Sequence, residues 1–243
     1  MSLNILIVVV VISCIQSIFG VGVLLFGTPL LLLQGYSFIE AVIILLPVSL
    51  SINIIQIAKD YKSADLAFYK KILTYTVPFV VIFLFVVTRL KINMGMVIGV
   101  FLLFVAAKDY SPQVNKIIKF LIRHEKIYLI TMGIIHGLTN LGGSLLAAIV
   151  HSKEYEKRTT RVTVALSYAT FAVFQILTLL VSGRNSDTGF LGIVIYMFAG
   201  VTVFLLTERL LYVEINNKNY SKYFAVFLFL SGILLIVRTM LPT

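Results

Sequence analysis

Long apolar stretches separated by short polar segments make up most of the chain, and their lengths predict membrane-spanning helices. A helix needs roughly 20 residues to cross a bilayer core about 30 Å thick. Most of the unbroken apolar stretches reach or approach that length, while the stretches 92–107 and 223–237 need their flanks to complete a crossing. The unbroken stretches are residues 37–58, 72–88, 92–107, 162–182, 189–207 and 223–237.

Two further apolar stretches, residues 3–34 and 127–150, are interrupted by glycines near their middle. The first break reads QSIFGVGVLLFGTP (residues 16–29) and the second reads HGLTNLGGS (residues 136–144). As one helix, the first stretch would be about 48 Å long, which is more than a simple crossing needs. Each half of the second stretch, roughly 10 to 12 residues, is too short to cross. We therefore expect two re-entrant helical hairpins, which fit the first stretch better than a single broken span.

The distribution of Lys and Arg supports the second hairpin. If every stretch crossed once, the basic residues would divide almost evenly between the two sides of the membrane. If residues 127–150 enter and leave on one face, that face holds 16 of the 20 Lys and Arg residues, a bias that the positive-inside rule describes. We expect this face to be cytoplasmic and both termini to lie outside. The basic residues left on the opposite face are Arg89, Lys91, Arg184 and Arg238.

Together these patterns predict an all-α polytopic membrane protein made of two inverted repeats. Each repeat is a re-entrant helical hairpin followed by three transmembrane helices, over about 1–108 and about 124–243. The odd number of crossings in the first repeat inverts the second, as in many secondary transporters. Similar polar spans follow the two hairpins, LLPVSLSINIIQ (45–56) and VALSYATFAVFQ (164–175). Because the connections are short, residues 1–243 form a single integral membrane transporter domain.

Composition agrees with this class of protein. Hydrophobic residues make up 60% of the chain and charged residues 12%, and the mean hydropathy is +1.04, whereas a soluble domain has about 25% charged residues. The net charge of +10 comes from clusters between apolar stretches, so we attribute it to topology rather than to nucleic-acid binding. No basic stretch precedes the first apolar segment, and we expect no removable signal peptide.

The helix breaks predict an anion-binding site. Irregular backbone at membrane depth is tolerated only where protein or a wet cavity covers it, and we expect the hairpin tips to meet there. The second helix of each hairpin begins at its tip, so free N–H groups and the positive dipole end would face an anion. Glycine would let that anion approach the backbone closely. Glu40 and Glu208 lie near the ends of apolar stretches, so we do not expect a carboxylate-based cation or proton site.

The candidate substrate-binding residues are glycines and small polar residues at the two breaks and in the helix that follows each break. Ser and Thr in membrane helices also bond their own backbone or a neighbouring helix, so each has a structural alternative. His136 is a candidate substrate donor or a titrating group in proton coupling, and it could equally cap the half helix. We expect no catalytic residue, metal ligand or cofactor. The candidates are Gln16, Ser17, Gly20, Gly22, Thr28, Ser49, Asn53, His136, Thr139, Asn140, Gly142, Gly143, Ser144 and Ser167.

The runs GVGVLLFGTPLLLLQG (20–35) and GIIHGLTNLGGSLL (133–146) resemble the two glycine-rich motifs of the TauE/SafE sulfite exporter family, also called the toluene sulfonate uptake permease family. The likeness covers both halves of the chain. It implies a multi-pass transporter of the bacterial inner membrane for sulfite, organosulfonates or related anions. Where the family often has a glycine triplet, this chain has GVGV (20–23) and GGS (142–144), which leaves the substrate open.

These observations favour a secondary transporter, not an enzyme, that exports a small anion such as sulfite or an organosulfonate by alternating access. Its partners would be that anion and the lipid bilayer, with a proton as a candidate coupling ion and no nucleic acid. An anion channel of the same architecture and a non-transporting membrane scaffold are the alternatives. An intramembrane enzyme has no support, because the chain contains no HExxH or GxSxG motif and no paired aspartates in its spans.

Overall fold

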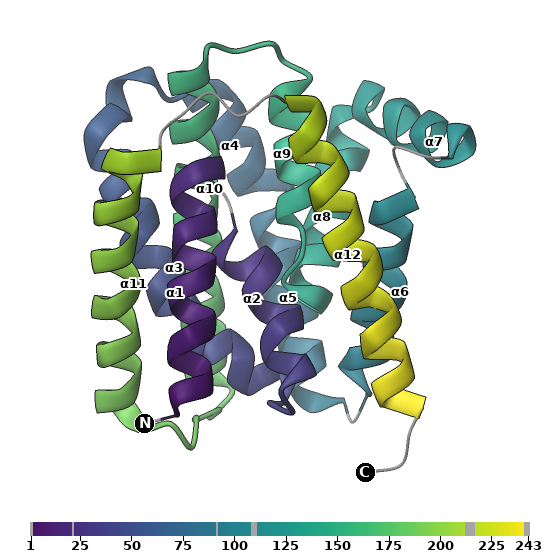
Figure 1. The fold of residues 1–243 in the computed structure, drawn as a ribbon. Coiled ribbons are helices and arrows are strands. Elements are labelled where there is room, and N and C mark those ends of the chain that lie inside the picture. Colours follow the sequence, from purple (N-terminus) through teal and green to yellow (C-terminus); the bar gives the residue numbers. More distant parts are fainter. Residues whose placement is uncertain (1, 21, 91, 108–110, 212–216, 241–243) are drawn as a thin grey trace.

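Helices account for all the regular secondary structure in the computed structural model, over the residues that it describes, 2–20, 22–90, 92–107, 111–211 and 217–240. Four runs are long and apolar enough to cross a membrane: Phe38–Ser63, Leu66–Arg89, Lys157–Val181 and Gly189–Glu208. The expected all-α class with membrane-length helices is confirmed. The helices are α1 (Leu3–Phe19), α2 (Val23–Leu33), α3 (Phe38–Asp60), α4 (Leu66–Tyr75), α5 (Val77–Arg89), α6 (Met94–Ala106), α7 (Pro112–Arg123), α8 (Glu125–Thr139), α9 (Gly143–His151), α10 (Lys157–Val181), α11 (Gly189–Leu211) and α12 (Asn217–Met240), with a 3-10 turn, η1 (Tyr61–Ser63), after α3 (Figure 1).

The chain reverses direction at both glycine-rich breaks. After α1, Gly20 has a φ of +74°, in the left-handed region that glycine adopts without strain. After α8, Asn140 has a φ of 62°, and asparagine is one of the few other residues that tolerate this conformation. In Figure 1, α1 and α2 both run between their break and the lower end of the helix bundle, whereas α8 and α9 run between theirs and the upper end.

The two ends of the bundle differ in their charged residues. The carboxyl ends of α3 and α9 lie at the upper end in Figure 1, which we call the basic face, because Lys59 is in the last turn of α3 and Lys153 directly follows α9. We call the lower end, where α1 begins and α12 ends, the terminal face. Two of the four basic residues expected there cap helix carboxyl ends: Arg238 donates to the Leu32 carbonyl over 2.9 Å, and Arg184 donates to that of Thr88. Arg89 ends α5 at the same face, and Lys91 lies outside the described residues.

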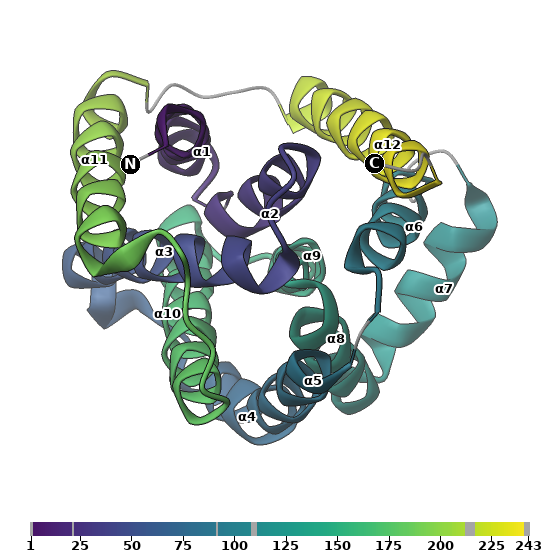
Figure 2. The same cartoon turned by 90° about the horizontal axis from the view of Figure 1, so that it is seen from below.

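Helix packing relates the two halves of the chain in a reciprocal pattern. α3 packs along α10, and α6 packs along α12 (Figure 2). α1 packs on α11 of the second half, just as α8 packs on α5 of the first. α5 also contacts α10, and α11 contacts α3. Exchanging α1, α3, α5 and α6 with α8, α10, α11 and α12 therefore maps each of these pairs onto itself or onto another of them.

The predicted span 72–88 is in fact two helices that meet at Thr76. Pro78 lies in the first turn of α5, where its missing N–H costs no helical hydrogen bond. The Thr76 hydroxyl donates to the Leu129 carbonyl over 3.0 Å and so joins this junction to α8.

The segment between α6 and α8, predicted to be only a polar connection, contains the amphipathic helix α7, so that prediction was incomplete. The Ser111 side chain caps the helix by accepting from the Val114 N–H. Ile118 is buried, whereas Ile117 and Phe120 are exposed, and α7 itself lies toward the basic face in Figure 1.

Candidate functional site

The predicted site residues fall into two groups, one at each break. The first group surrounds the α1–α2 break and includes two residues of α3. The second surrounds the α8–α9 break and includes Thr28 of α2 and Ser167 of α10. Every predicted residue is buried except Ser144, which is half-buried. The first group is Gln16, Ser17, Gly20, Gly22, Ser49 and Asn53, and the second is Thr28, His136, Thr139, Asn140, Gly142, Gly143, Ser144 and Ser167.

Several hydroxyls in both groups bond their own helix, as the structural alternative anticipated. Thr139 donates to the Ile135 carbonyl over 2.7 Å, and Ser167 donates to that of Thr163 over 2.7 Å. Ser17 makes a similar bond to the Cys14 carbonyl in α1, and Ser144 bonds the Leu141 carbonyl in the break itself. These contacts explain how the hydroxyls are tolerated in an apolar environment without a ligand.

At the first break, Gln16 closes the turn. Its side-chain nitrogen donates to the Gly20 carbonyl over 3.1 Å, and its oxygen accepts from the Val23 N–H over 3.0 Å. The nitrogen also lies 3.5 Å from the Asn53 side-chain oxygen on α3. One of the α2 N–H groups that we expected to face a ligand is therefore capped by the chain itself.

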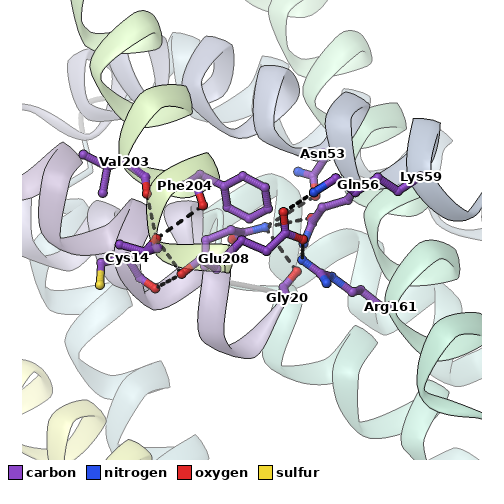
Figure 3. Close-up of polar contacts among 12 residues, drawn as sticks. Cys14, Gly20, Asn53, Gln56, Lys59, Arg161, Val203, Phe204 and Glu208 are labelled. Carbon is purple, nitrogen blue, oxygen red and sulfur yellow. Dashed lines mark hydrogen bonds and ion pairs between the residues drawn. The ribbon is translucent and has the colours of Figure 1, made fainter. Parts of the chain in front are cut away.

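Charged residues that were not predicted as site residues lie against this break (Figure 3). A Cβ on Gly20 would lie 3.5 Å from Cγ of Arg161 in α10. Arg161 donates to Glu208 of α11, and Glu208 also accepts from Lys59 of α3. The Glu208 side chain is 8% exposed, that of Arg161 16% and that of Lys59 46%. We call Lys59, Arg161 and Glu208 the ion trio.

Gln56 connects the ion trio to the first break. The oxygen and nitrogen of a side-chain amide are told apart by their hydrogen-bond partners. Only one orientation of the Gln56 amide gives partners of the right kind to both atoms. In it, the oxygen accepts from Arg161 over 3.2 and 3.3 Å, and the nitrogen donates to Asn53 over 3.1 Å. A polar path thus runs from the first turn of α2, through Gln16, Asn53 and Gln56, to the ion trio.

At the second break, Asn140 joins three elements. Its side-chain nitrogen donates to the Thr28 hydroxyl over 3.1 Å, and its oxygen accepts from Gln175 of α10 over 3.2 Å. We expected the two tips to meet, and the hydrogen bond from Asn140 reaches α2 at Thr28, beyond the first turn of that helix. Arg161 and Gln175, which contact the first and second groups, lie about 21 Å apart along α10.

Neighbouring side chains leave no room for a Cβ at the two glycines of the second break, Gly142 and Gly143. A Cβ on Gly143 would lie 1.2 Å from the Tyr168 hydroxyl oxygen, and one on Gly142 would lie 2.5 Å from Cβ of His136. The close approach that we expected from a ligand at Gly143 is thus made by Tyr168 of α10.

His136 is fully buried beside this break. The centroid of its imidazole ring lies 4.8 Å from that of the Phe171 ring. Among the described residues, no hydrogen bond of good geometry reaches either ring nitrogen, and the side-chain oxygen of Gln175, which lies beside the imidazole, is likewise unpaired. Buried polar atoms are normally paired. The second break therefore holds polar groups that the protein's own contacts do not satisfy.

A cavity of about 480 Å³ opens at the terminal face. It lies between the carboxyl ends of α2, α5 and α12 and the beginnings of α3 and α6, and its lining includes Tyr36, Asn93 and Arg238. An anion approaching from this face would meet the Arg238 guanidinium.

Sequence reasoning missed Gln56, Arg161, Gln175 and Glu208. A signal was present for three of them. Gln56 and Gln175 end the two similar polar spans, and Glu208 is the only carboxylate between residues 189 and 211, where a buried acid needs a partner. Arg161 gave no such signal, because it directly precedes the apolar run and resembles a loop charge.

Comparison with protein-family models matches residues 5–235 to the family described as Sulfite exporter TauE/SafE. No curated protein and no solved structure matches the chain. The match covers nearly the whole chain, including both glycine-rich breaks and the ion trio.

Proposed function

This chain belongs to the sulfite exporter TauE/SafE family, and we propose that it is a secondary transporter that exports a small anion such as sulfite or an organosulfonate by alternating access. Family membership implies a multi-pass membrane transporter of sulfite-like anions and not an enzyme. The carrier mechanism, the direction and the residues named below are our proposal.

The observation that carries the proposal is the set of unsatisfied polar atoms at the second break. Leaving a buried donor or acceptor unpaired costs about 1–3 kcal/mol, which a bound polar ligand offsets. His136 can donate to an oxyanion, and the Asn140 amide lies one turn along the chain from it. We assign substrate binding to these two residues, with Thr28, Thr139 and Ser144 around them.

Reciprocal helix packing supports two inverted repeats within one integral membrane domain, over about 1–108 and 124–243. In this scheme α1–α2 and α8–α9 are re-entrant hairpins, and α7 lies on the membrane surface between the repeats. The terminal face then holds few basic residues, and the positive-inside rule makes the basic face cytoplasmic. Both repeats place a break within the bundle, reached from opposite faces.

Alternating access assigns different roles to the two faces. The cavity beside Arg238 gives an anion an aqueous approach from the terminal face. On the other side, the ion trio and Gln56 cover the first break. We interpret this arrangement as a conformation closed toward the basic face. Transport would require these contacts to open while the terminal cavity closes.

Radiolabelled sulfite and sulfonate flux in proteoliposomes, with and without a pH gradient, tests the proposal. Saturable flux with counterflow supports a carrier, and a dependence on the gradient identifies the proton as the coupling ion. High ohmic conductance would instead indicate an anion channel. No flux of any anion would indicate a non-transporting scaffold. Lys62→Ala, at an exposed residue of the turn η1 that belongs to neither group of site residues, is the matched control and should transport like wild type.

A further inference from the structure

The ion trio has the composition of an anion site that a carboxylate of the protein already occupies. Lys59 and Arg161 carry two positive charges, and Glu208 carries one negative charge between them. A planar guanidinium recognises oxyanions through several N–H donors, whether they come from a side chain or a solute. Because Arg161 and Glu208 are both largely buried, each needs a partner at all times.

The trio is placed to act on the first hairpin. Arg161 packs on Gly20 at the tip, and Gln56 connects its guanidinium to Asn53. One residue before Glu208 in α11, the Thr207 hydroxyl donates to that of Ser17 in α1 over 2.8 Å. Movement of Glu208 away from Arg161 would therefore release α11 from α10 next to the hairpin tip.

The packing of the helices around the first break does not by itself require charged side chains there. The exchange that relates the two halves pairs the first break, at the end of α1, with the second, at the end of α8. Among the described residues, the side chains that pair at the second break are neutral: Thr28, Asn140 and Gln175. Since neutral side-chain pairs suffice at the second break itself, the ion trio at the first serves a purpose beyond closing a break.

We propose that Glu208 is an internal competitor of the transported anion. Its carboxylate occupies Arg161 and Lys59 when the first break holds no substrate, and an oxyanion arriving at the tip displaces it and binds Arg161. This exchange keeps the buried guanidinium paired throughout and couples anion arrival to separation of α10 and α11. The inference rests on the proposed transport function and adds a second, charged anion site on the route.

Sulfite binding to the purified full-length chain, measured by titration calorimetry, tests the competition. Glu208→Gln keeps the side-chain volume but removes the competing charge, so sulfite should bind at least about fivefold more tightly than to wild type. Arg161→Gln should lose this binding, and Arg161→Lys should retain part of it. Equal or weaker binding to a folded Glu208→Gln variant would overturn the proposal.

Glu125 provides a matched control, because it too is a carboxylate between two cations at the basic face. It contacts Lys71 over 2.7 Å and Lys153 over 3.0 Å, away from both breaks. Glu125→Gln should leave sulfite affinity unchanged. If it tightens binding as much as Glu208→Gln, the effect is one of overall charge and the competitor role is wrong.

Fold and function are checked separately. Size-exclusion profiles and thermal unfolding identify variants that fail to fold. If Arg161→Gln fails to fold, the charge-conserving Arg161→Lys still tests whether Arg161 binds sulfite. If wild type transports sulfite and the Glu208→Gln variant binds it no more tightly, only this inference fails. If wild type neither binds nor transports any anion tried, both proposals fail.

Discussion

The side-chain amide of Asn140 donates to the hydroxyl of Thr28 over 3.1 Å and thereby joins the two hairpins. Asn140 also holds the left-handed backbone conformation that ends α8, and it accepts from Gln175 of α10. The residue that makes the second break is therefore the one that contacts the first hairpin. A change in the position of either hairpin must alter this contact.

Comparing Asn140→Gly with Asn140→Ala separates the backbone role of Asn140 from its side-chain role. Both variants lose two side-chain hydrogen bonds, each worth about 1 kcal/mol, but only alanine adds the left-handed strain of roughly 1 kcal/mol. We expect both to reduce sulfite flux about tenfold or more, and alanine to lower the unfolding temperature further. Wild-type flux in Asn140→Gly would show that the side chain takes no part in transport.

Gly143→Ala should displace α9, because the new Cβ would lie 1.2 Å from the Tyr168 hydroxyl oxygen. Overpacking of this kind costs typically 1–3 kcal/mol, so we expect a lower unfolding temperature and little flux. Adding Tyr168→Ala should recover part of the stability by removing the clash. Gly192→Ala is the control, since its Cβ would meet only the Thr188 methyl group. An unchanged unfolding temperature in Gly143→Ala would mean that Tyr168 moves aside at no cost.

The helix breaks could be predicted from sequence because their signals are local. Glycine and asparagine permit the left-handed turn, and short apolar halves on either side cannot cross a bilayer alone. Gln16, Asn53 and Asn140 could be named for a related reason, since burying an amide in an apolar helix demands a partner. Which partner each one has was beyond the sequence, because it depends on how α3 and α10 cross.

Arg161 shows the limit of counting charges along a chain. It directly precedes an apolar run and was assigned to a cytoplasmic loop, yet α10 begins at Lys157 and carries Arg161 into the bundle. Its burial arises from packing against Gly20 and Glu208, which are distant in sequence. α7 was missed for a different reason: its apolar residues alternate with Lys and Arg, and a short amphipathic helix has the composition of a polar loop.

Acid should weaken the attachment of the second hairpin at the basic face. Burial alone raises the pKa of Glu125, but hydrogen bonds from Lys71 and Lys153 and their charges outweigh it and lower that pKa. A carboxylate with a lowered pKa stabilises the fold above its unfolded value of about 4.3, and this stabilisation disappears as pH falls through the folded pKa. Because the pairs are partly exposed, they contribute at most about 1 kcal/mol.

Thermal unfolding of Glu125→Gln between pH 3 and pH 7 measures this contribution. We expect the variant to unfold roughly 2–4 °C below wild type at pH 7, and the difference to shrink toward pH 3 as the wild-type carboxylate is protonated. A constant difference across this range would show that Glu125 acts through packing and not through its charge.

Cysteine labelling decides whether the second hairpin is re-entrant. Between Lys62, exposed at the basic face, and Asn185, exposed in the loop before α11, the chain passes through α4–α5, α6, the α8–α9 hairpin and α10. If the hairpin returns to the face it entered from, this path crosses the membrane an odd number of times and the two residues lie on opposite sides. If the hairpin spans, they lie on the same side.

In a background in which Cys14, the only native cysteine, is replaced by serine, we expect a membrane-impermeant maleimide to label Asn185→Cys in intact cells. Lys62→Cys should react only after permeabilisation, because the positive-inside rule places the basic face in the cytoplasm. The reverse pattern would keep the hairpin but invert the orientation, and with it the side from which the cavity beside Arg238 opens. Labelling of both cysteines from one side would refute the re-entrant hairpin and the inverted repeat that depends on it.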